Sequence, residues 1–242
     1  GGPGGGGAAG GAGGAPGAPG APGAPGAPGA AGGAGRPPAR DTTPTGVYRS
    51  DDGGQTWRGP FIVAHDDANR VLYWDQRLTV LHDAGAPDDG QLFGVFWSHD
   101  RTAQEDLPMH AAWGSPDGER WSAPHSTGIA GQIAAPLALP GGRMFVAYVH
   151  RHDPPSLRAL LSNDFGKSWD AAAELVFYEK QRGGREAGMA GPRDFGDYWA
   201  DMSIWTFGHP APARLPNGDV MVAYYAGDNN SMSMHWVRIT LD

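Results

Sequence analysis

Three short stretches of the sequence share one pattern and decide the fold. Residues 50–57 read SDDGGQTW, residues 115–121 read SPDGERW, and residues 162–169 read SNDFGKSW. Each stretch begins with Ser, carries Asp and Gly at its centre, and ends on Trp. Ser and Asp side chains bond backbone N–H groups in tight turns, and Gly readily takes the positive φ that such turns need. The pattern therefore predicts three turns with one structural role.

A second repeat accompanies these stretches. The segments beginning at positions 77, 135 and 211 each contain an apolar run, a Gly-containing turn and a second run rich in β-forming residues, at 92–97, 144–149 and 220–225. Runs and turns of these lengths are typical of antiparallel hairpins. The Trp residues that end the three stretches are 64 and 48 residues apart, which fits one stretch in each blade of a β-propeller.

The stretch 50–57 matches the Asp-box pattern S-x-D-x-G-x-T-W in full, 162–169 matches with Ser for Thr, and 115–121 is a shortened form. The chain thereby resembles the sialidase superfamily over residues 46–242. The resemblance implies a six-bladed β-propeller with the box at the turn between the third and fourth strands of a blade, away from the active face. We therefore expect an all-β fold, an incomplete sialidase-like β-propeller of about three to four blades of four antiparallel strands.

The box residues are expected to be structural. Their carboxylates should accept hydrogen bonds within the turns, and the three Trp side chains should be largely buried at equivalent sites. The residues concerned are Ser50, Asp52, Gly54, Trp57, Ser115, Asp117, Trp121, Ser162, Asp164, Gly166 and Trp169.

Composition bounds the domain organisation and the classes of function. Residues 1–40 form a Gly/Ala/Pro tract without the apolar side chains that offset chain entropy, which predicts a disordered leader before a folded domain at 41–242. The formal net charge of −8 and the scattered Lys and Arg argue against a nucleic-acid partner. No apolar run approaches the ~20 residues of a membrane span, and the absence of Cys excludes disulfides and thiolate chemistry. We expect no cofactor, and the sequence leaves a secreted and a cytoplasmic location both open.

Alignment of the repeats on their Gly turns predicts the site. It places Asp75, Ile133 and His209 at one equivalent position, on the inner strands that line the channel of a propeller. Loops after the second strands add His99 and other polar side chains. We expect acid/base work from carboxylates and imidazoles in this region. The expected catalytic residues are Asp75, His209, Tyr225 and Asp228.

Neighbouring polar and aromatic side chains are expected to bind substrate. The polar, Gly-rich insertion at 180–201 is either a lid over the site or a surface loop. The pair His150 and His152 lacks a recognised metal-ligand spacing, so no metal is expected. Together with the catalytic residues, His150 and Arg151 are expected to converge on one face near the propeller axis. The expected substrate-binding residues are Gln76, Gln132, His150, Arg151, Trp74 and Tyr198.

The resemblance also implies a chemistry from which the sequence departs. Sialidases use a Tyr nucleophile with a partner Glu, an Asp acid/base and three Arg. In the segment that matches the family's Y-S-x-h-x-x-L-x-x-G pattern, His209 stands at the Tyr position and Tyr225 at the Glu position. We therefore expect no cleavage of a standard sialoside by this chain. Three functions stay open: a sialidase-like glycoside hydrolase acting on terminal sugars of glycans, a non-catalytic carbohydrate-binding propeller, and an incomplete propeller without activity.

Overall fold

The computed structural model describes residues 44–82, 89–152, 154–180, 205–228 and 230–241. These residues belong to one compact unit. The leader predicted at 1–40 lies outside the described residues, as does nearly all of the insertion at 180–201. Within the described residues the regular structure is β-strand, apart from one turn of 3-10 helix at Ala171–Ala173. None of the helical structure described is long and apolar enough to cross a membrane.

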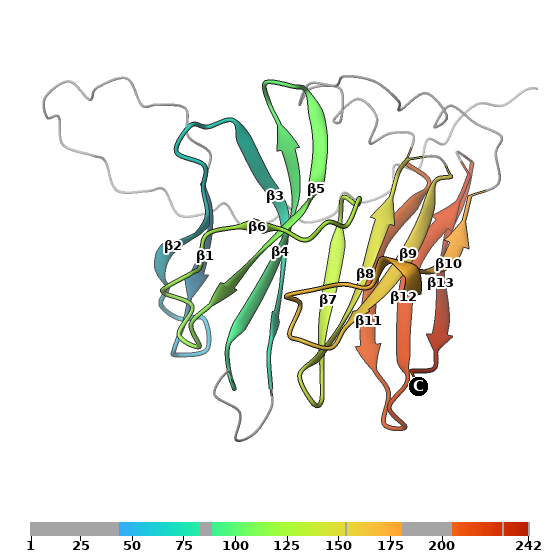
Figure 1. The fold of residues 1–242 in the computed structure, drawn as a ribbon. Coiled ribbons are helices and arrows are strands. Elements are labelled where there is room, and N and C mark those ends of the chain that lie inside the picture. The colour runs from blue at the N-terminus through green and yellow to red at the C-terminus, as the bar shows by residue number, and fades with distance from the viewer. Residues whose placement is uncertain (1–43, 83–88, 153, 181–204, 229, 242) are drawn as a thin grey trace, which may run out of the picture. The chain divides into compact units, whose positions relative to one another are not determined.

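The strands form four antiparallel sheets that follow one another along the chain (Figure 1). Sheet 1 is the pair β1 (Thr45–Arg49) and β2 (Arg58–Ala64). Sheet 2 contains β3 (Val71–Val80), β4 (Leu92–Asp100), β5 (Glu105–Gly114) and β6 (His125–Ser126). Sheet 3 contains β7 (Ala134–Leu139), β8 (Arg143–His150), β9 (Ser156–Ser162) and β10 (Leu175–Glu179). Sheet 4 contains β11 (Phe207–Arg214), β12 (Val220–Gly227) and β13 (Met232–Ile239).

The sheets are arranged as blades of a β-propeller. In sheets 2, 3 and 4 the strands are hydrogen-bonded in sequence order, each to the next. The first strands of these sheets contact one another, β3 with β7 and β7 with β11. Up-and-down sheets whose first strands meet are the units of a propeller. The fold class predicted from the sequence is confirmed: the described residues form two four-stranded blades, one three-stranded blade and one strand pair.

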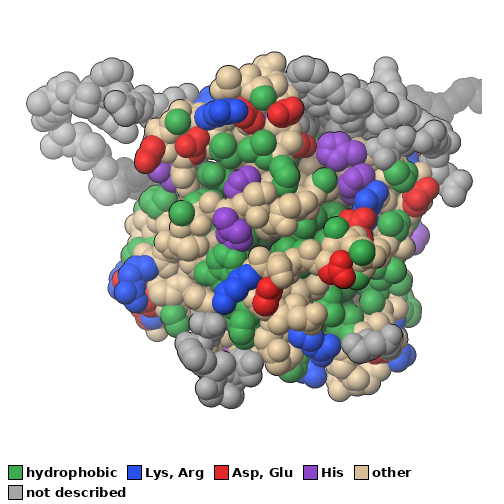
Figure 2. Space-filling model, in the orientation of Figure 1, with side chains coloured by type: hydrophobic (Ala, Val, Ile, Leu, Met, Phe, Trp, Pro, Cys, Tyr) green, Lys and Arg blue, Asp and Glu red, His purple; other side chains and the backbone are tan. Residues whose placement is uncertain are grey.

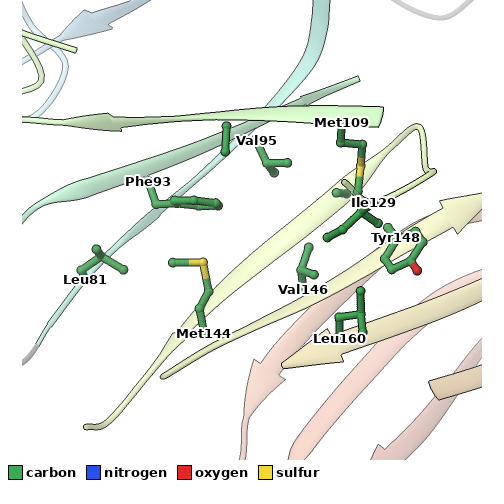
Figure 3. Close-up of a cluster of buried hydrophobic side chains, with 11 residues drawn as sticks. Leu81, Phe93, Val95, Met109, Ile129, Met144, Val146, Tyr148 and Leu160 are labelled. Atoms are coloured by element: carbon green, nitrogen blue, oxygen red, sulfur yellow. The ribbon is translucent and has the colours of Figure 1, made fainter. Parts of the chain in front are cut away.

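The core lies between successive sheets because each inner sheet is covered on both faces. Figure 3 shows Phe93 and Val95 of sheet 2 beside Met144 and Val146 of sheet 3, in one cluster of buried side chains. Nearly every residue of β4 and β8 is buried, as expected of strands that have a neighbouring sheet on each face. Burial of one such large apolar side chain contributes roughly 1.5–3 kcal/mol. This packing holds sheets 2 and 3 against each other.

The three Ser-Asp turns, at 50–57, 115–121 and 162–169, carry a dense set of local hydrogen bonds. The hydroxyl of Ser50 accepts from the N–H of Gly54 at 2.7 Å, and Ser162 accepts in the same way from Gly166 at 2.9 Å. The Asp52 carboxylate accepts from the backbone N–H groups three and four residues later, at 3.0 and 2.9 Å. In the shorter turn, an Asp carboxylate accepts from a backbone N–H at 3.0 Å. These bonds fix the conformation of the three turns.

The expectation that all three turn Trp side chains are largely buried is wrong. Trp57 is 62% exposed, whereas Trp121 and Trp169 are half-buried. Trp57 and Trp121 still make one common bond, from the indole N–H to the carbonyl of the turn glycine, at 3.0 and 2.9 Å. The difference arises from the neighbours: Trp169 packs against the core cluster between sheets 2 and 3, while Trp57 ends the turn that joins the two strands of sheet 1.

Candidate functional site

Two bulges mark the first strands of sheets 2 and 4. Asp75 in β3 and His209 in β11 both have φ of 46°, and the strand register shifts at both places. Non-glycine residues rarely adopt this left-handed conformation, and where they do the strain is concentrated at functional sites. A bulge also re-aims the side chain it carries. The two positions that the repeat alignment equates are therefore distorted alike.

The third aligned position behaves differently. Ile133 immediately precedes β7 and is 3% exposed. It packs with Trp97 and Leu157 in the cluster between the inner ends of the sheets. The aligned position in sheet 3 thus packs in the core. The polar side chain that sheet 3 adds to this region, Arg151, comes from the loop after β8.

Arg77 and His209 join sheets 2 and 4 directly. The Arg77 Nη2 atom lies 3.2 Å from His209 Nδ1. A guanidinium only donates hydrogen bonds, so Nδ1 accepts, and His209 is neutral with its proton on Nε2. Burial lowers the pKa of His209, and the charges of Arg77 and Arg151 lower it further against the opposing charge of Asp75. The imidazole still reaches solvent and can donate from Nε2.

The pKa of Asp75 is shifted in the opposite direction to that of His209. Burial raises the pKa of the Asp75 carboxyl above its usual range, and the nearby positive charges of Arg77 and Arg151 only partly oppose this. Part of its side chain nevertheless remains exposed to solvent, so the group is accessible. A carboxyl of raised pKa beside an imidazole of lowered pKa is a combination suited to proton transfer near neutral pH.

Tyr225 completes the sheet 4 side of this group. Its ring lies 5.8 Å from the His209 ring, tilted by 34°, and it is half-buried. In the β11–β12 ladder it pairs with Gly208, and a Cβ added at Gly208 would lie 2.9 Å from the Tyr225 hydroxyl. Glycine at 208 therefore lets the phenol approach the bulge. We name Asp75, Arg77, His209, Tyr225 and Arg151 the bulge group.

Arg151 is the contribution of sheet 3 to the bulge group. It follows β8 directly and is 5% exposed. Its guanidinium carbon lies 4.0 Å from the centre of the Trp205 ring and 5.1 Å from that of Phe207, and its Nη2 donates to the Phe207 carbonyl at 3.2 Å. The structure thus brings one residue from each of three sheets together: Asp75, Arg151 and His209.

Asp228 is placed elsewhere. Its carboxylate accepts from the backbone N–H groups of Asn230 at 2.7 Å and Ser231 at 3.0 Å, in the turn between β12 and β13. These two bonds lower the pKa of Asp228. No contact recorded among the described residues links it to the bulge group. Asp228 acts here as the acceptor of its own turn.

The predicted substrate-binding residues divide into different environments. Trp74 stacks on His99 at 5.7 Å and meets Trp97 edge-on at 4.8 Å, so its ring is engaged by protein. His150 is 8% exposed, and burial lowers its pKa. Gln76, next to Asp75 in β3, is half-buried. The predicted Tyr198 lies outside the described residues.

Asp106 is a buried polar residue that sequence reasoning missed. Its side chain is 9% exposed, and its carboxylate accepts from Trp97 Nε1 at 2.9 Å and from Gln132 Nε2 at 2.8 Å. His99 Nδ1 lies 3.2 Å from the same carboxylate. Because Gln132 precedes β7, this group ties sheet 2 to sheet 3 beside Trp74. Gln132, predicted to bind substrate, is thus buried, and its side-chain amide donates to the Asp106 carboxylate.

The described surface around these blades carries mixed charge. Figure 2 shows acidic and basic side chains interspersed with apolar and neutral ones, and histidines at several places on the face in view. The arrangement agrees with the small excess of acidic over basic residues in the sequence.

No family model matches the chain, and a search of curated proteins gives no match. Among solved structures, the chain is similar to a protein of unknown function from Dyadobacter fermentans, with a TM-score of 0.56 and 18% identity, over 82% of this chain and 46% of that one. A second is the Hadza microbial sialidase Hz136, with a TM-score of 0.48 and 15% identity, over 79% of this chain and 37% of that one. A third is a thermostable family-43 glycoside hydrolase, with a TM-score of 0.36 and 12% identity, over 70% of this chain and 55% of that one. The chain thus spans between 37% and 55% of the length of these proteins. The likeness to the first structure concerns the fold alone.

Proposed function

We propose that the bulge group is the active site of a sialidase-related glycoside hydrolase that acts on terminal sugars of glycans. The observation that carries the proposal is the pair of strained bulges at Asp75 and His209 on two blades. Arg77, two residues after Asp75, contacts His209 at 3.2 Å, and the Asp75 charge acts on the His209 pKa. Backbone strain of this kind is kept where a side chain must be aimed at a ligand. The Ser-Asp turns, which resemble the Asp-boxes of sialidases, support the glycan class.

Asp75 is the proton-transferring group in this proposal. Its raised pKa keeps part of the carboxyl protonated closer to neutral pH. The protonated carboxyl gives its proton to the glycosidic oxygen as the bond from that oxygen to the anomeric carbon breaks, and the leaving sugar departs as an alcohol. Water then attacks the oxocarbenium-like carbon, and the proton released by water returns to the Asp75 carboxylate.

The other members of the bulge group bind and orient. His209, neutral because Arg77 donates to its Nδ1, offers its Nε2–H to a sugar hydroxyl. Tyr225 supplies a half-buried ring and hydroxyl at the edge of the bulge. Since His209 and Tyr225 replace the Tyr and Glu of sialidases, the proposed substrate is a glycoside other than a standard sialoside.

One observation favours a second candidate, a propeller that binds a sugar without cleaving it. Glycoside hydrolases generally use two carboxyl groups. Within the described residues, the contacts of the bulge group include one carboxyl, that of Asp75. A single carboxyl with an imidazole and a phenol suffices to hold hydroxyl groups by hydrogen bonds.

Turnover of a panel of fluorogenic glycosides, with a sialoside included, tests the proposal. The wild-type chain is expected to cleave at least one neutral or acidic glycoside, and Asp75→Asn is expected to lose roughly 10²–10⁴-fold of that activity, the usual size of a general acid–base contribution. Asp67→Asn is the matched control, because that side chain is fully exposed on the turn before β3. Saturable binding of a sugar without turnover would replace the hydrolase by the second candidate.

A further inference from the structure

The Arg151 side chain is enclosed by its own protein. Trp205 and Phe207 lie against the guanidinium at 4.0 and 5.1 Å, and 5% of the residue is exposed. A guanidinium is planar and weakly hydrated, so it stacks on aromatic rings while it donates in its plane. A residue so covered has little surface to present to a ligand.

We propose that Arg151 is a positioning residue, which anchors the strand entering the His209 bulge and supplies a fixed positive charge behind the bulge group. The proposal deepens the proposed function and rests on it for its catalytic consequence. Its structural part concerns His209 in the protein without ligand, and that part can be tested whether or not the chain hydrolyses a glycoside.

The anchoring role follows from the position of the carbonyl that accepts the Arg151 hydrogen bond. Arg151 Nη2 donates to the carbonyl of Phe207, the first residue of β11 and two residues before His209. Ladder pairing with β12 is interrupted between Gly208 and Ala211. The bond from sheet 3 therefore restrains the backbone at the point where the bulge begins. Arg151→Lys would keep the charge but lose the planar fork that stacks on Trp205 and donates in the same plane.

The charge of Arg151 acts on two titrating groups. The groups that face His209 are Asp75 and Arg77 from β3, Arg151 from the loop after β8, and the Tyr225 ring from β12. Both Asp75 and His209 feel the Arg151 charge, which lowers the pKa of each. Removal of this cation should raise both pKa values, and His209 would then be charged over a wider pH range.

The test is an NMR titration of His209 in the protein without ligand. The chain has nine His residues, so a His209→Gln variant identifies the signal. Arg151→Met is expected to raise the His209 pKa by about half a unit or more, because the Arg151 charge acts on His209 and a nearby charge is worth this much at the effective dielectric of a protein. Arg101→Met is the matched control, because Arg101 follows β4 as Arg151 follows β8 and is exposed; it should leave the titration unchanged.

Arg151→Lys separates the anchor from the charge. It should shift the His209 pKa less than Arg151→Met does, while it moves the backbone amide signals of Gly208 and His209. If Arg151→Met fails to fold, the His209 pKa and the amide signals of Arg151→Lys are sufficient to test the proposal. An unchanged pKa and unchanged amide signals in folded variants, with a KM raised instead, would overturn the proposal and make Arg151 a ligand contact. Absence of turnover in the wild type, with the pKa shift present, would reject the proposed hydrolase and leave the positioning role intact.

Discussion

Asp75 and His209 have the same backbone conformation, φ of 46°, at bulges in the first strands of two different blades. Arg77, two residues after Asp75 in β3, lies with its Nη2 3.2 Å from His209 Nδ1. Two strained residues at equivalent places in a repeat are the structural reason for locating the site here. Because glycine takes a positive φ without strain, glycine substitutions at these positions can remove the side chain at little cost in stability.

Replacement of His209 by glycine should cost little stability. Glycine takes φ of 46° without strain, and relief of roughly 1–2 kcal/mol offsets the loss of the imidazole contacts. The free energy of unfolding of His209→Gly, measured by urea denaturation, should lie within about 1 kcal/mol of the wild-type value. His110→Gly is the control, because His110 is a half-buried residue inside the regular strand β5. A greater loss at 209 than at 110 would contradict the interpretation of strain.

Gly166→Ala should be strongly destabilising. Gly166 has φ of 79°, and a Cβ there would lie 2.8 Å from the buried Phe93 ring. Backbone strain and overpacking together predict a loss of about 2–4 kcal/mol in the free energy of unfolding. Gly54 holds the same position in the turn at 50–57, with φ of 89° and nothing nearer than 3.7 Å to an added Cβ. Gly54→Ala should therefore show the strain alone, about 1–2 kcal/mol, and equal losses would argue against the clash.

The turn Trp residues should differ in their contribution to stability. Trp169 packs against the cluster between sheets 2 and 3, so Trp169→Ala should cost about 3 kcal/mol, at the low end for a buried aromatic. Trp57→Ala should cost less than half as much, because Trp57 is 62% exposed. Chemical denaturation of both variants measures the difference. A Trp57 loss as large as that of Trp169 would mean that further structure covers sheet 1.

Acid should weaken the turn at 50–57 through Asp52. A hydrogen bond from the Thr56 hydroxyl, with others from the turn, lowers the pKa of Asp52 from 3.8 to about 2. A depressed carboxyl pKa adds stability that is present above 3.8 and is lost as the pH falls towards 2. Asp52→Asn should therefore flatten the fall of the melting temperature between pH 4 and pH 2, whereas Asp67→Asn should not. The same acid dependence in Asp52→Asn and the wild type would contradict the assignment.

The sequence predicted the fold well because the signals that set it are local. Asp, Gly and Ser at fixed spacings form a turn by bonding their own backbone, and the apolar runs between turns mark the strands. The degree of burial could not be predicted in the same way. Trp57 and Trp169 end almost identical stretches, yet the presence or absence of a packed neighbouring sheet decides which of them is covered.

The site was predictable only in part. The repeat alignment placed Asp75 and His209 together, but an Asp or a His in a strand gives no signal of a left-handed bulge. Asp228 lies in a D-N-N-S run whose short side chains favour bonding within the turn, and in the structure its carboxylate accepts from two N–H groups of that turn. Asp106 was missed because one of its donors, Gln132, comes from a segment 26 residues away and no short motif records the contact.

The proton-transfer role of Asp75 is tested most directly by Asp75→Gly, assayed with and without added formate on the glycoside that the wild type cleaves best. Glycine fits φ of 46°, so the variant should keep its melting temperature while it loses the carboxyl. The account predicts turnover lowered by roughly 10²–10⁴-fold and partly restored by formate, which supplies a carboxyl in the vacated space. Turnover at the wild-type level in Asp75→Gly without formate would contradict it.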